Sequence, residues 1–420
     1  MSCNEWKEYK LGEIMDISSS KRIYAKEYIS NGIPFYRGKE IIEKFKGNEV
    51  STELFISEER FKELKEKFGI PKKGDILLTS VGTLGVPYLV QEEEFYFKDG
   101  NLTWFKNFNI NCCSEFIYYW IQSSYGVNQI YSKSIGSTQK ALTIDMLKKF
   151  DILLPPLKEQ IEISNILSSL DNKIKLNNEM NKTLEEMAQS IFKRWFVDFE
   201  FPNEDGEPYK SSGGEMVDSE FGMIPNGWEV QCIGDIGNVI TGKTPSAKVE
   251  GSYGDECNFI TPRDITDSPI ILNTERKLSS IGINNLKKNL VCKNSIGVSC
   301  IGSNLGEVYI TGENSITNQQ INTVVLDESH IYPYVYIYLK NMKNEFLNMA
   351  GGSAVPIINK TSFSGINILM PDMYILNKFV QSTTCYFERI EENLKENESL
   401  IALRDSLLPK LMSGEIDINL

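Results

Sequence analysis

The sequence predicts an α+β fold in which two similar domains, each mixing strands with a few helices, are separated by two long antiparallel coiled-coil helices. Three observations support this prediction: an internal duplication, short β-type runs broken by glycines, and two heptad-patterned segments that each begin near a proline. The duplication also implies an internal pseudo-two-fold symmetry. A chain of 420 residues is long enough for several separate hydrophobic cores.

The duplication is visible along most of the chain. "EWKEYKLGEI" from Glu5 returns as "GWEVQCIGDI" from Gly227, and "SVGTLGV" from Ser80 returns as "CIGSNLGEV" from Cys300. Between the copies, "PNEDGEPYKSSGGEMVDSE" from Pro202 is rich in Gly, Pro, Ser and acidic residues, which indicates a linker or exposed loop. We therefore predict a first domain at 1–153, a first helical region at 154–200, a linker at 201–224, a second domain at 225–369 and a second helical region at 370–420.

The two predicted helices share an unusual polar centre. Each carries two asparagines on its apolar seam, and these are Asn177 and Asn181 in the first helix and Asn393 and Asn397 in the second. Buried asparagine lowers stability but fixes register, because misalignment leaves its amide against apolar neighbours. Antiparallel packing would place Asn177 beside Asn397 and Asn181 beside Asn393, and would set small Ala188 against large Tyr386. The alternative is two independent helices, each in the core of its own domain.

Composition limits the function classes. No apolar run is long enough to span a bilayer, and residues 1–13 lack the apolar core of a signal peptide, so we expect a cytoplasmic protein. The net charge of −13 is concentrated in the helical regions, which leaves both domains near neutral. None of the eight cysteines is spaced C-x-x-C and His330 is the single histidine. We therefore expect neither a metal site nor histidine-based catalysis.

Two short motifs suggest catalysis but fail on their context. "GNVITGKT", Gly237 to Thr244, fits the phosphate-binding pattern and keeps open a P-loop nucleotide-binding enzyme. A phosphate-binding loop needs a helix directly after it, but here Pro245 follows at once and the next segment, "VEGSYGDE", is a poor helix former. A glycine turn is therefore the better interpretation. "LLPP" at Leu153 is compared with the Asn/Asp-Pro-Pro-aromatic motif of amino-methyltransferases, but Leu154 and Leu157 stand where that motif needs its polar and aromatic residues. We therefore predict no catalytic residues on this chain.

The duplicated motifs together resemble the specificity (S) subunits of Type I restriction–modification systems. The resemblance covers nearly the whole chain, and its strongest marks are "GSTQKALTIDMLKKFDILLPPLKEQIEISNILSSLDNKI", "QSIFKRWFVDF" at Gln189, "ITGKTPS", and "LRDSLLPKLMSGEI" at Leu403. Arg404 on the seam and the Cys112-Cys113 pair depart from the family's pattern. Two further alternatives remain: a specificity module of another type of modification enzyme, and a coiled-coil adaptor that does not bind DNA.

The resemblance implies a non-catalytic protein. Its two target-recognition domains, each with a strongly bent sheet, would read the halves of a split asymmetric double-stranded DNA sequence. The helical regions would dock two methyltransferase (M) subunits that methylate adenine, and two motor-nuclease (R) subunits that cleave unmodified DNA could join them. No cofactor is expected on this chain, whereas S-adenosylmethionine, ATP and Mg²⁺ are expected on the partner subunits.

Candidate DNA-binding residues are polar or basic side chains in glycine-bounded loops, because Arg, Lys, Asn and Gln read base edges and Ser and Thr hold phosphates. In the first half they are Arg37, Lys39, Ser80, Thr83, Ser137, Thr138, Gln139 and Lys140. In the second half they are Arg263, Ser303, Asn304, Asn318, Gln319, Gln320 and Ser353.

Overall fold

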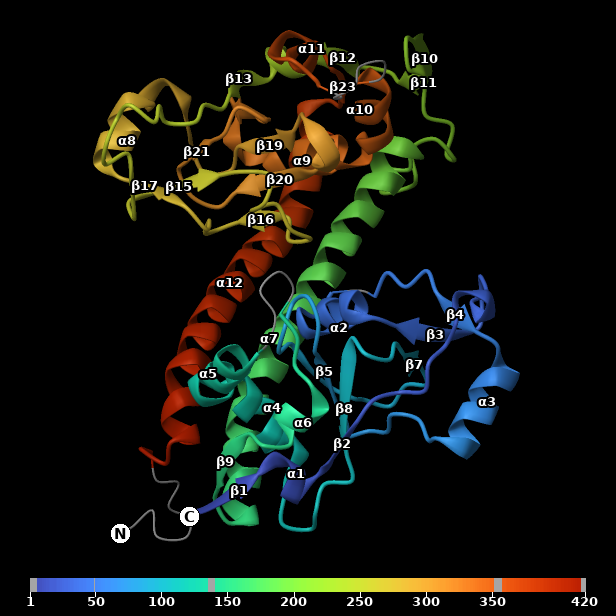
Figure 1. The fold of residues 1–420 in the computed structure, drawn as a ribbon. Helices are drawn as coiled ribbons and strands as arrows, with labels where there is room; N and C mark the ends of the chain where they lie inside the picture. Colours follow the sequence, from blue (N-terminus) through green and yellow to red (C-terminus); the bar gives the residue numbers. More distant parts are fainter. Residues whose placement is uncertain (1–5, 49, 135–139, 351–356, 417–420) are drawn as a thin grey trace. The chain divides into compact units, whose positions relative to one another are not determined.

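The computed structural model describes residues 6–48, 50–134, 140–350 and 357–416, which form two compact units (Figure 1). The first unit comprises Met1–Lys175 and Ser399–Leu420, and the second comprises Leu176–Glu398. Two long helices, α7 (Leu157–Phe192) and α12 (Met373–Met412), each contribute to both units. In the described part of the chain, no helix is both long and apolar enough to cross a membrane.

The first unit contains two small sheets and a separate strand pair. Its strands are β1 (Lys7–Lys10), β2 (Asp16–Ser18), β3 (Ile33–Tyr36), β4 (Phe55–Ile56), β5 (Ile76–Thr79), β6 (Pro87–Leu89), β7 (Tyr96–Phe97), β8 (Leu102–Lys106) and β9 (Asp151–Leu154). One sheet has the antiparallel order β2-β8-β5-β6, and the other has the order β4-β3-β7 with β3 and β7 parallel. β1 pairs with β9.

The helices of the first unit cover these sheets and join them to the long helices. They are α1 (Leu11–Ile14), α2 (Gly38–Phe45), α3 (Glu58–Lys67), α4 (Ser114–Gln122), α5 (Ser124–Lys133) and α6 (Ile144–Leu147). Phe116 and Trp120 of α4 share one core with Leu78 of β5, Leu167 of α7 and Leu411 of α12. That shared core fixes the first domain on the ends of both long helices.

The second unit repeats this plan with longer sheets. Its strands are β10 (Met216–Ser219), β11 (Gly222–Pro225), β12 (Glu229–Cys232), β13 (Gly237–Thr241), β14 (Tyr253–Gly254), β15 (Cys257–Ile260), β16 (Ile270–Ile271), β17 (Lys277–Leu278), β18 (Leu290–Val291), β19 (Ile296–Ser299), β20 (Val308–Thr311), β21 (Ser315–Thr317), β22 (Ile321–Leu326) and β23 (Asn367–Met370). Its helices include α8 (Ser280–Asn285), α9 (Tyr332–Asn341), α10 (Lys343–Met349) and α11 (Lys360–Ser364).

Strand pairing confirms the internal duplication. The order β13-β22-β19-β20 corresponds to β2-β8-β5-β6, and β17-β15-β21 corresponds to β4-β3-β7 with the parallel pair retained. The pair β12-β23 corresponds to β1-β9. The predicted α+β class with two similar domains is therefore observed, and equivalent residues can be matched strand by strand.

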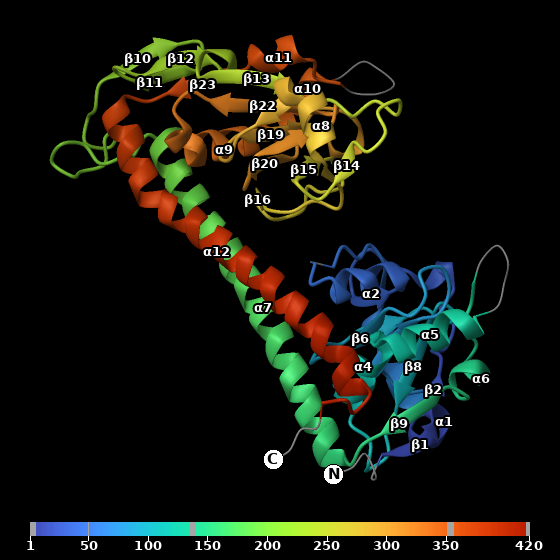
Figure 2. The ribbon, with the colours of Figure 1, turned by 90° about the vertical axis from the view of Figure 1, so that its left-hand side faces the viewer.

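The long helices begin where the prolines predict. Pro155 and Pro156 precede α7, whose last turn continues as a π-helical segment, Lys193–Val197. Within each unit α7 and α12 lie side by side and run antiparallel (Figure 2). In the second unit Ala188 of α7 and Phe387 of α12 are both buried in the same core. The alternative of two independent core helices is therefore not observed.

The four seam asparagines form the pairs that the heptad pattern predicts, all within the second unit. Asn177 Nδ2 donates to Asn397 Oδ1 at 2.9 Å, and Asn393 Nδ2 donates to Asn181 Oδ1 at 2.7 Å. Asn397 Nδ2 also donates to Oδ1 of Asn178. All four seam side chains are buried. Burial makes an unpaired amide costly, so these bonds favour one register over its neighbours.

Arg404, which the seam pattern left unexplained, is paired within the first unit. Its Nη1 lies 2.8 Å from Oδ1 of Asp171 on α7, and Tyr119 Oη of α4 donates to the other oxygen of Asp171 at 2.8 Å. The Asp171 carboxylate thus joins α4, α7 and α12. The charge on Arg404 is therefore neutralised where an apolar seam residue is expected.

The segment predicted as a linker contains regular structure. Residues 216–225 form the hairpin β10-β11. The ring of Phe201 stacks on Tyr209 and on Trp228, with centroid distances of 4.5 and 5.1 Å. These aromatic contacts attach the segment to the second unit, although its composition alone favours an exposed loop.

Candidate nucleic-acid interface

Several turns of the first unit come together at the ends of β3 and β5. A Cβ built on Gly38, just after β3, would lie 4.0 Å from Thr79 Cγ2 at the end of β5. The N–H of Ser80 donates to the carbonyl of Asn101 at 2.8 Å, and the Ser80 carbonyl accepts from the N–H of Leu142 at 2.9 Å. We call this group the first turn cluster; it comprises residues 37–39, 80–85, 98–101 and 140–142.

The second unit builds the same group with the same bonds. The N–H of Cys300 donates to the carbonyl of Gln320 at 2.7 Å, and the Cys300 carbonyl accepts from the N–H of Ile358 at 3.0 Å. Asn304 Nδ2 donates to the carbonyl of Pro262 at 3.0 Å. This second turn cluster comprises residues 242–246, 261–264, 300–306, 318–320 and 357–358.

One turn is capped identically in both clusters. In the first, the N–H of Arg37 donates to the carboxylate of Glu40 at 2.7 Å; in the second, the N–H of Thr261 donates to that of Asp264 at 2.8 Å. The residue immediately before the acidic residue is basic in both units. These equivalent, exposed cations are Lys39 and Arg263. A positive charge kept at one place in both domains suits a contact common to any DNA sequence, namely a phosphate.

Arg37 is held by its neighbour rather than free in solvent. Its Nη2 lies 2.7 Å from Oε1 of the fully buried Glu40, and its side chain is 32% exposed. The hydrogen bond to Glu40 raises the pKa of the Arg37 guanidinium. The guanidinium thus neutralises a buried carboxylate while one edge still faces solvent.

The remaining predicted residues differ in exposure. Thr83 is exposed next to Gly82, which has a φ of +84°. Lys140 is exposed, with its ammonium 5.7 Å from the ring centroid of Tyr131. Gln319 is exposed and accepts a hydrogen bond from Thr244. These three side chains remain candidates for contact with DNA.

Two predicted residues have buried side chains that are bonded within the fold. Ser80 is 2% exposed and its hydroxyl shares a hydrogen bond of 2.6 Å with Thr103 Oγ1, so its side chain belongs to the core. Its counterpart in the second unit, Cys300, is also buried. Asn318 is 8% exposed, and its Oδ1 accepts from the N–H of Gln320 at 3.0 Å to close a turn. Residue type alone did not reveal this burial.

For five predicted residues the structure describes no side chain. Ser303 lies in the short 3₁₀ turn Gly302–Asn304, which belongs to the second turn cluster. The others fall outside the described residues, and they are Ser137, Thr138, Gln139 and Ser353.

The phosphate-loop interpretation of Gly237–Thr244 is excluded by its conformation. Gly237–Thr241 is strand β13, paired antiparallel with β22, and no helix follows it before α8. Gly242 is needed for close packing, because an added Cβ would lie 2.1 Å from the carbonyl oxygen of Asn318. Backbone N–H groups are thus not arranged around a phosphate. The loop instead packs into the second turn cluster.

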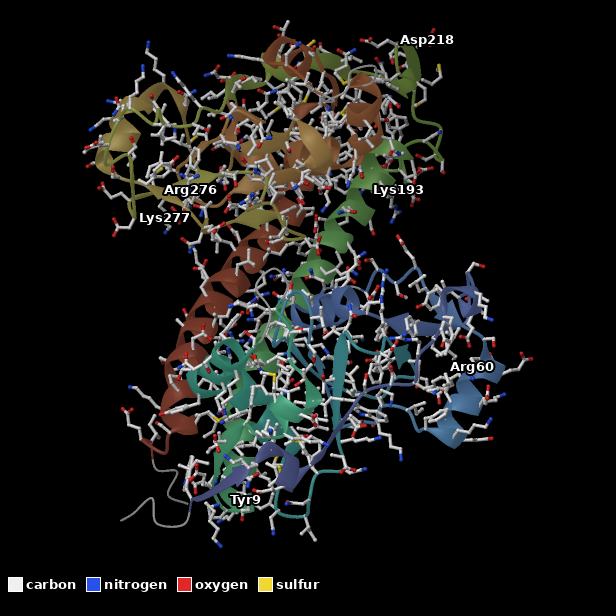
Figure 3. The ribbon with its side chains drawn as sticks, viewed as in Figure 1. Tyr9, Arg60, Lys193, Asp218, Arg276 and Lys277 are labelled. Atoms are coloured by element: carbon white, nitrogen blue, oxygen red, sulfur yellow. The ribbon has the colours of Figure 1, made fainter. Side chains whose placement is uncertain are left out.

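A hollow of about 510 Å³ beside the second turn cluster contains residues that the sequence did not single out. Thr244 lies on its wall, as do Tyr253 and Arg276. The Arg276 guanidinium lies over the Tyr253 ring, 4.0 Å from its centroid. Figure 3 shows Arg276 beside Lys277 at the start of β17. Arg276 lies outside the glycine-bounded loops, immediately before β17, so only its spatial closeness to Thr244 reveals it.

Metal-ligating residues do not gather in the described ranges, where no three His, Cys, Asp or Glu side chains could hold one ion. The structure thus defines a protein with two copies of one domain, each with a polar turn cluster and a basic residue at an equivalent place.

Comparison with known proteins identifies the family. The model of the Type I restriction modification DNA specificity domain matches residues 4–186 and again 225–398. The chain therefore belongs to this family and is a specificity subunit of a Type I restriction–modification system.

Relatives of similar length support this assignment. The HindI specificity subunit of Haemophilus influenzae is 30% identical over 98% of this chain and 100% of its own length. The MjaIX specificity subunit of Methanocaldococcus jannaschii is 27% identical over 99% of this chain and 94% of its own. The crystal structure of the S subunit from M. genitalium aligns over 98% of this chain and 97% of that one, with a TM-score of 0.57 and 15% identity, and so supports the fold.

Proposed function

We propose that each turn cluster of this specificity subunit binds one half of a split asymmetric DNA sequence. The observation that carries this proposal is that both clusters share one backbone scaffold while their exposed side chains differ. The shared cations, Lys39 and Arg263, would hold phosphates at a similar place in each half-site. The polar side chains around them would then contact base edges that differ between the halves.

We further propose that the long helices dock two M subunits, which carry S-adenosylmethionine and methylate adenine. Apolar side chains exposed on α7 support a partner there, because Leu176 is 53% exposed and Met187 is 44% exposed. The chain itself would hold no cofactor and catalyse no reaction. R subunits with ATP and Mg²⁺ would join the assembly to cleave unmodified DNA.

A methyl-transfer assay with purified proteins tests this function. The chain alone, the M subunit alone, and the two together are given DNA fragments from the host and labelled S-adenosylmethionine. We expect label in DNA only when both proteins are present, and at adenines within one split motif. Transfer by the chain alone, or by the M subunit alone at the same sites, would contradict the proposal.

The charge-reversal variants Lys39→Glu and Arg263→Glu provide matched tests of the two clusters. Each variant places a carboxylate where a phosphate is expected, so each should weaken DNA binding by the assembly. Lys67→Glu on α3 serves as a control for net charge, because Lys67 is exposed, is not a cluster residue and pairs only with Glu63 of the same helix at 3.0 Å in the described part of the chain. A control that weakens binding as much as the cluster variants would show that only overall charge matters.

A further inference from the structure

We propose that Arg276 is a base-reading residue of the second domain that binds the major-groove edge of a guanine. This inference rests on the proposed function, because it requires that the second domain contacts a half-site. It adds a residue that lies outside the glycine-bounded loops and that no repeat motif contains.

The first argument is the state of the guanidinium. Arg276 is exposed, and in the described part of the chain its guanidinium takes part in no ion pair; it lies over Tyr253 at 4.0 Å and near Phe259 at 5.9 Å. Stacking on an aromatic ring fixes the plane of a guanidinium but leaves its N–H edge free to donate. A fixed donor edge loses less entropy on binding than a mobile side chain.

The second argument is its position beside the second turn cluster. Arg276, Tyr253 and Thr244 all line the hollow of about 510 Å³. Thr244 donates to Gln319, an exposed member of the cluster. The Arg276 side chain is therefore continuous with the surface proposed to face DNA.

The third argument comes from the matching position in the first domain. The N–H of Phe35 donates to the carbonyl of Leu54 at 2.9 Å, and the N–H of Phe259 donates to that of Arg276 at 3.1 Å. The strand register supports the same equivalence, because Pro34 pairs with Phe55 in the first unit and Asn258 pairs with Lys277 in the second. Leu54 thus occupies the place of Arg276.

The aromatic support beneath this position is present in both domains. Tyr28 lies 5.1 Å from Phe35 between ring centroids, and Tyr253 lies 6.1 Å from Phe259. In the first unit Leu54 packs with Tyr28 against a core that includes Phe35. The fold therefore accepts leucine at this place, so the arginine is not required for the domain to form.

This difference distinguishes base reading from phosphate binding. A phosphate contact is useful at any sequence, so it should recur in both domains, as the pair Lys39 and Arg263 does. A base contact should differ between domains that read different half-sites. The planar fork of arginine donates two parallel hydrogen bonds to O6 and N7 of guanine, which is the commonest specific contact in the major groove.

The test compares methylated motifs, read at base resolution in hosts that express the M subunit with each chain. Arg276→Leu installs the residue of the first domain and should preserve the fold, which thermal unfolding would verify. We expect discrimination to fall by about 5- to 150-fold at a single G·C position of one half-site, with the other half-site unchanged. Arg276→Gln, which removes the guanidinium but keeps a polar side chain, should relax the same position and shift preference toward adenine.

Arg263→Leu is the matched control for a phosphate contact. It should reduce methylation evenly across sites, leave the motif unchanged and lower the salt dependence of DNA binding by about one unit of log–log slope. If Arg276→Leu and Arg276→Gln both keep the wild-type motif, the inference is overturned, whether their level of methylation equals that of the wild-type chain or is lower at all sites. Failure of the wild-type chain to direct methylation to any split motif would instead overturn the proposed function.

Discussion

Asn393 Nδ2 donates to Asn181 Oδ1 at 2.7 Å, and both side chains are at least nine-tenths buried between α7 and α12 in the second unit. This hydrogen bond satisfies the amide group of Asn393 and the carbonyl oxygen of Asn181, and burial leaves little room for water to take the place of either partner. The pair therefore opposes any slippage of one helix along the other, because slippage would place both amides against apolar side chains.

A double-mutant cycle measures this coupling. Asn181→Leu leaves the Asn393 amide without its partner, and the reverse holds for Asn393→Leu, so each single substitution should lower the free energy of unfolding by about 1–3 kcal/mol. The double substitution replaces both amides with apolar groups and should recover much of that loss, giving a coupling energy of about 0.5–3 kcal/mol. Urea unfolding followed by helical circular dichroism provides the values. Additive losses would show that the two amides do not depend on each other.

The reactivity of the cysteines should follow their burial. Burial raises the pKa of Cys112 to about 12 and that of Cys300 to about 11. A raised pKa leaves less of the reactive thiolate at about pH 8, so both thiols should be alkylated slowly, and faster only as the pH approaches those values. Cys292 and Cys385 are exposed and should be alkylated first.

Mass spectrometry of peptides from chain treated briefly with iodoacetamide would give the order of modification. Denatured chain is the control, because all four thiols should then react at similar rates. Cys112 belongs to the core that α4 shares with both long helices, and Cys300 belongs to the second turn cluster. Rapid modification of either thiol in the native chain would contradict this packing.

Gly242→Ala tests the role of the glycine in the "GKT" sequence. The new Cβ would lie 2.1 Å from the Asn318 carbonyl oxygen and 2.3 Å from Thr317 Oγ1, so the second turn cluster must shift, at a cost of about 1–3 kcal/mol. Lys243→Ala is the control: it removes an exposed side chain but keeps the N–H that donates to the Thr317 carbonyl at 2.8 Å, so stability should hardly change. Thermal unfolding and nucleotide binding are measured for both. We expect neither the native chain nor the variants to bind nucleotide; binding by the native chain that is lost in Lys243→Ala would contradict the glycine-turn interpretation.

Exchange of residues 1–150 for the matching domain of a relative tests the independence of the two readers. The first turn cluster lies within residues 37–142 and is closed by its own backbone bonds, so its contacts with DNA should move with it. We expect the methylated motif to change in one half and stay constant in the other. A change in both halves at once would show that the domains do not read separately.

Periodic and repeated patterns in the sequence predicted the fold better than single residues predicted the site. The heptad seam identified both long helices and the asparagine pairs, because helix packing follows the period of the apolar residues. The duplication identified the repeated sheets, down to equivalent turns. Residue type and a nearby glycine were weaker guides: Ser80 is buried against Thr103, although its sequence context looks like an exposed loop.

Arg276 and Arg404 show what the sequence could not reveal. The partner of Arg404 is Asp171, which is distant in sequence and reached only when α7 and α12 pack. Arg276 becomes notable only when the strand register shows that it occupies the position of Leu54 in the other domain, and when its guanidinium is seen to lie over Tyr253. Both depend on long-range pairing, which a local pattern does not specify.

Base-resolution methylation sequencing of a host that expresses the neighbouring methyltransferase, with and without this chain, tests the central claim most directly. If the chain is the sequence reader, adenine methylation should appear at one split asymmetric motif only when the chain is present. Methylation at the same motif without the chain, or methylation with the chain that follows no split sequence, would contradict the account.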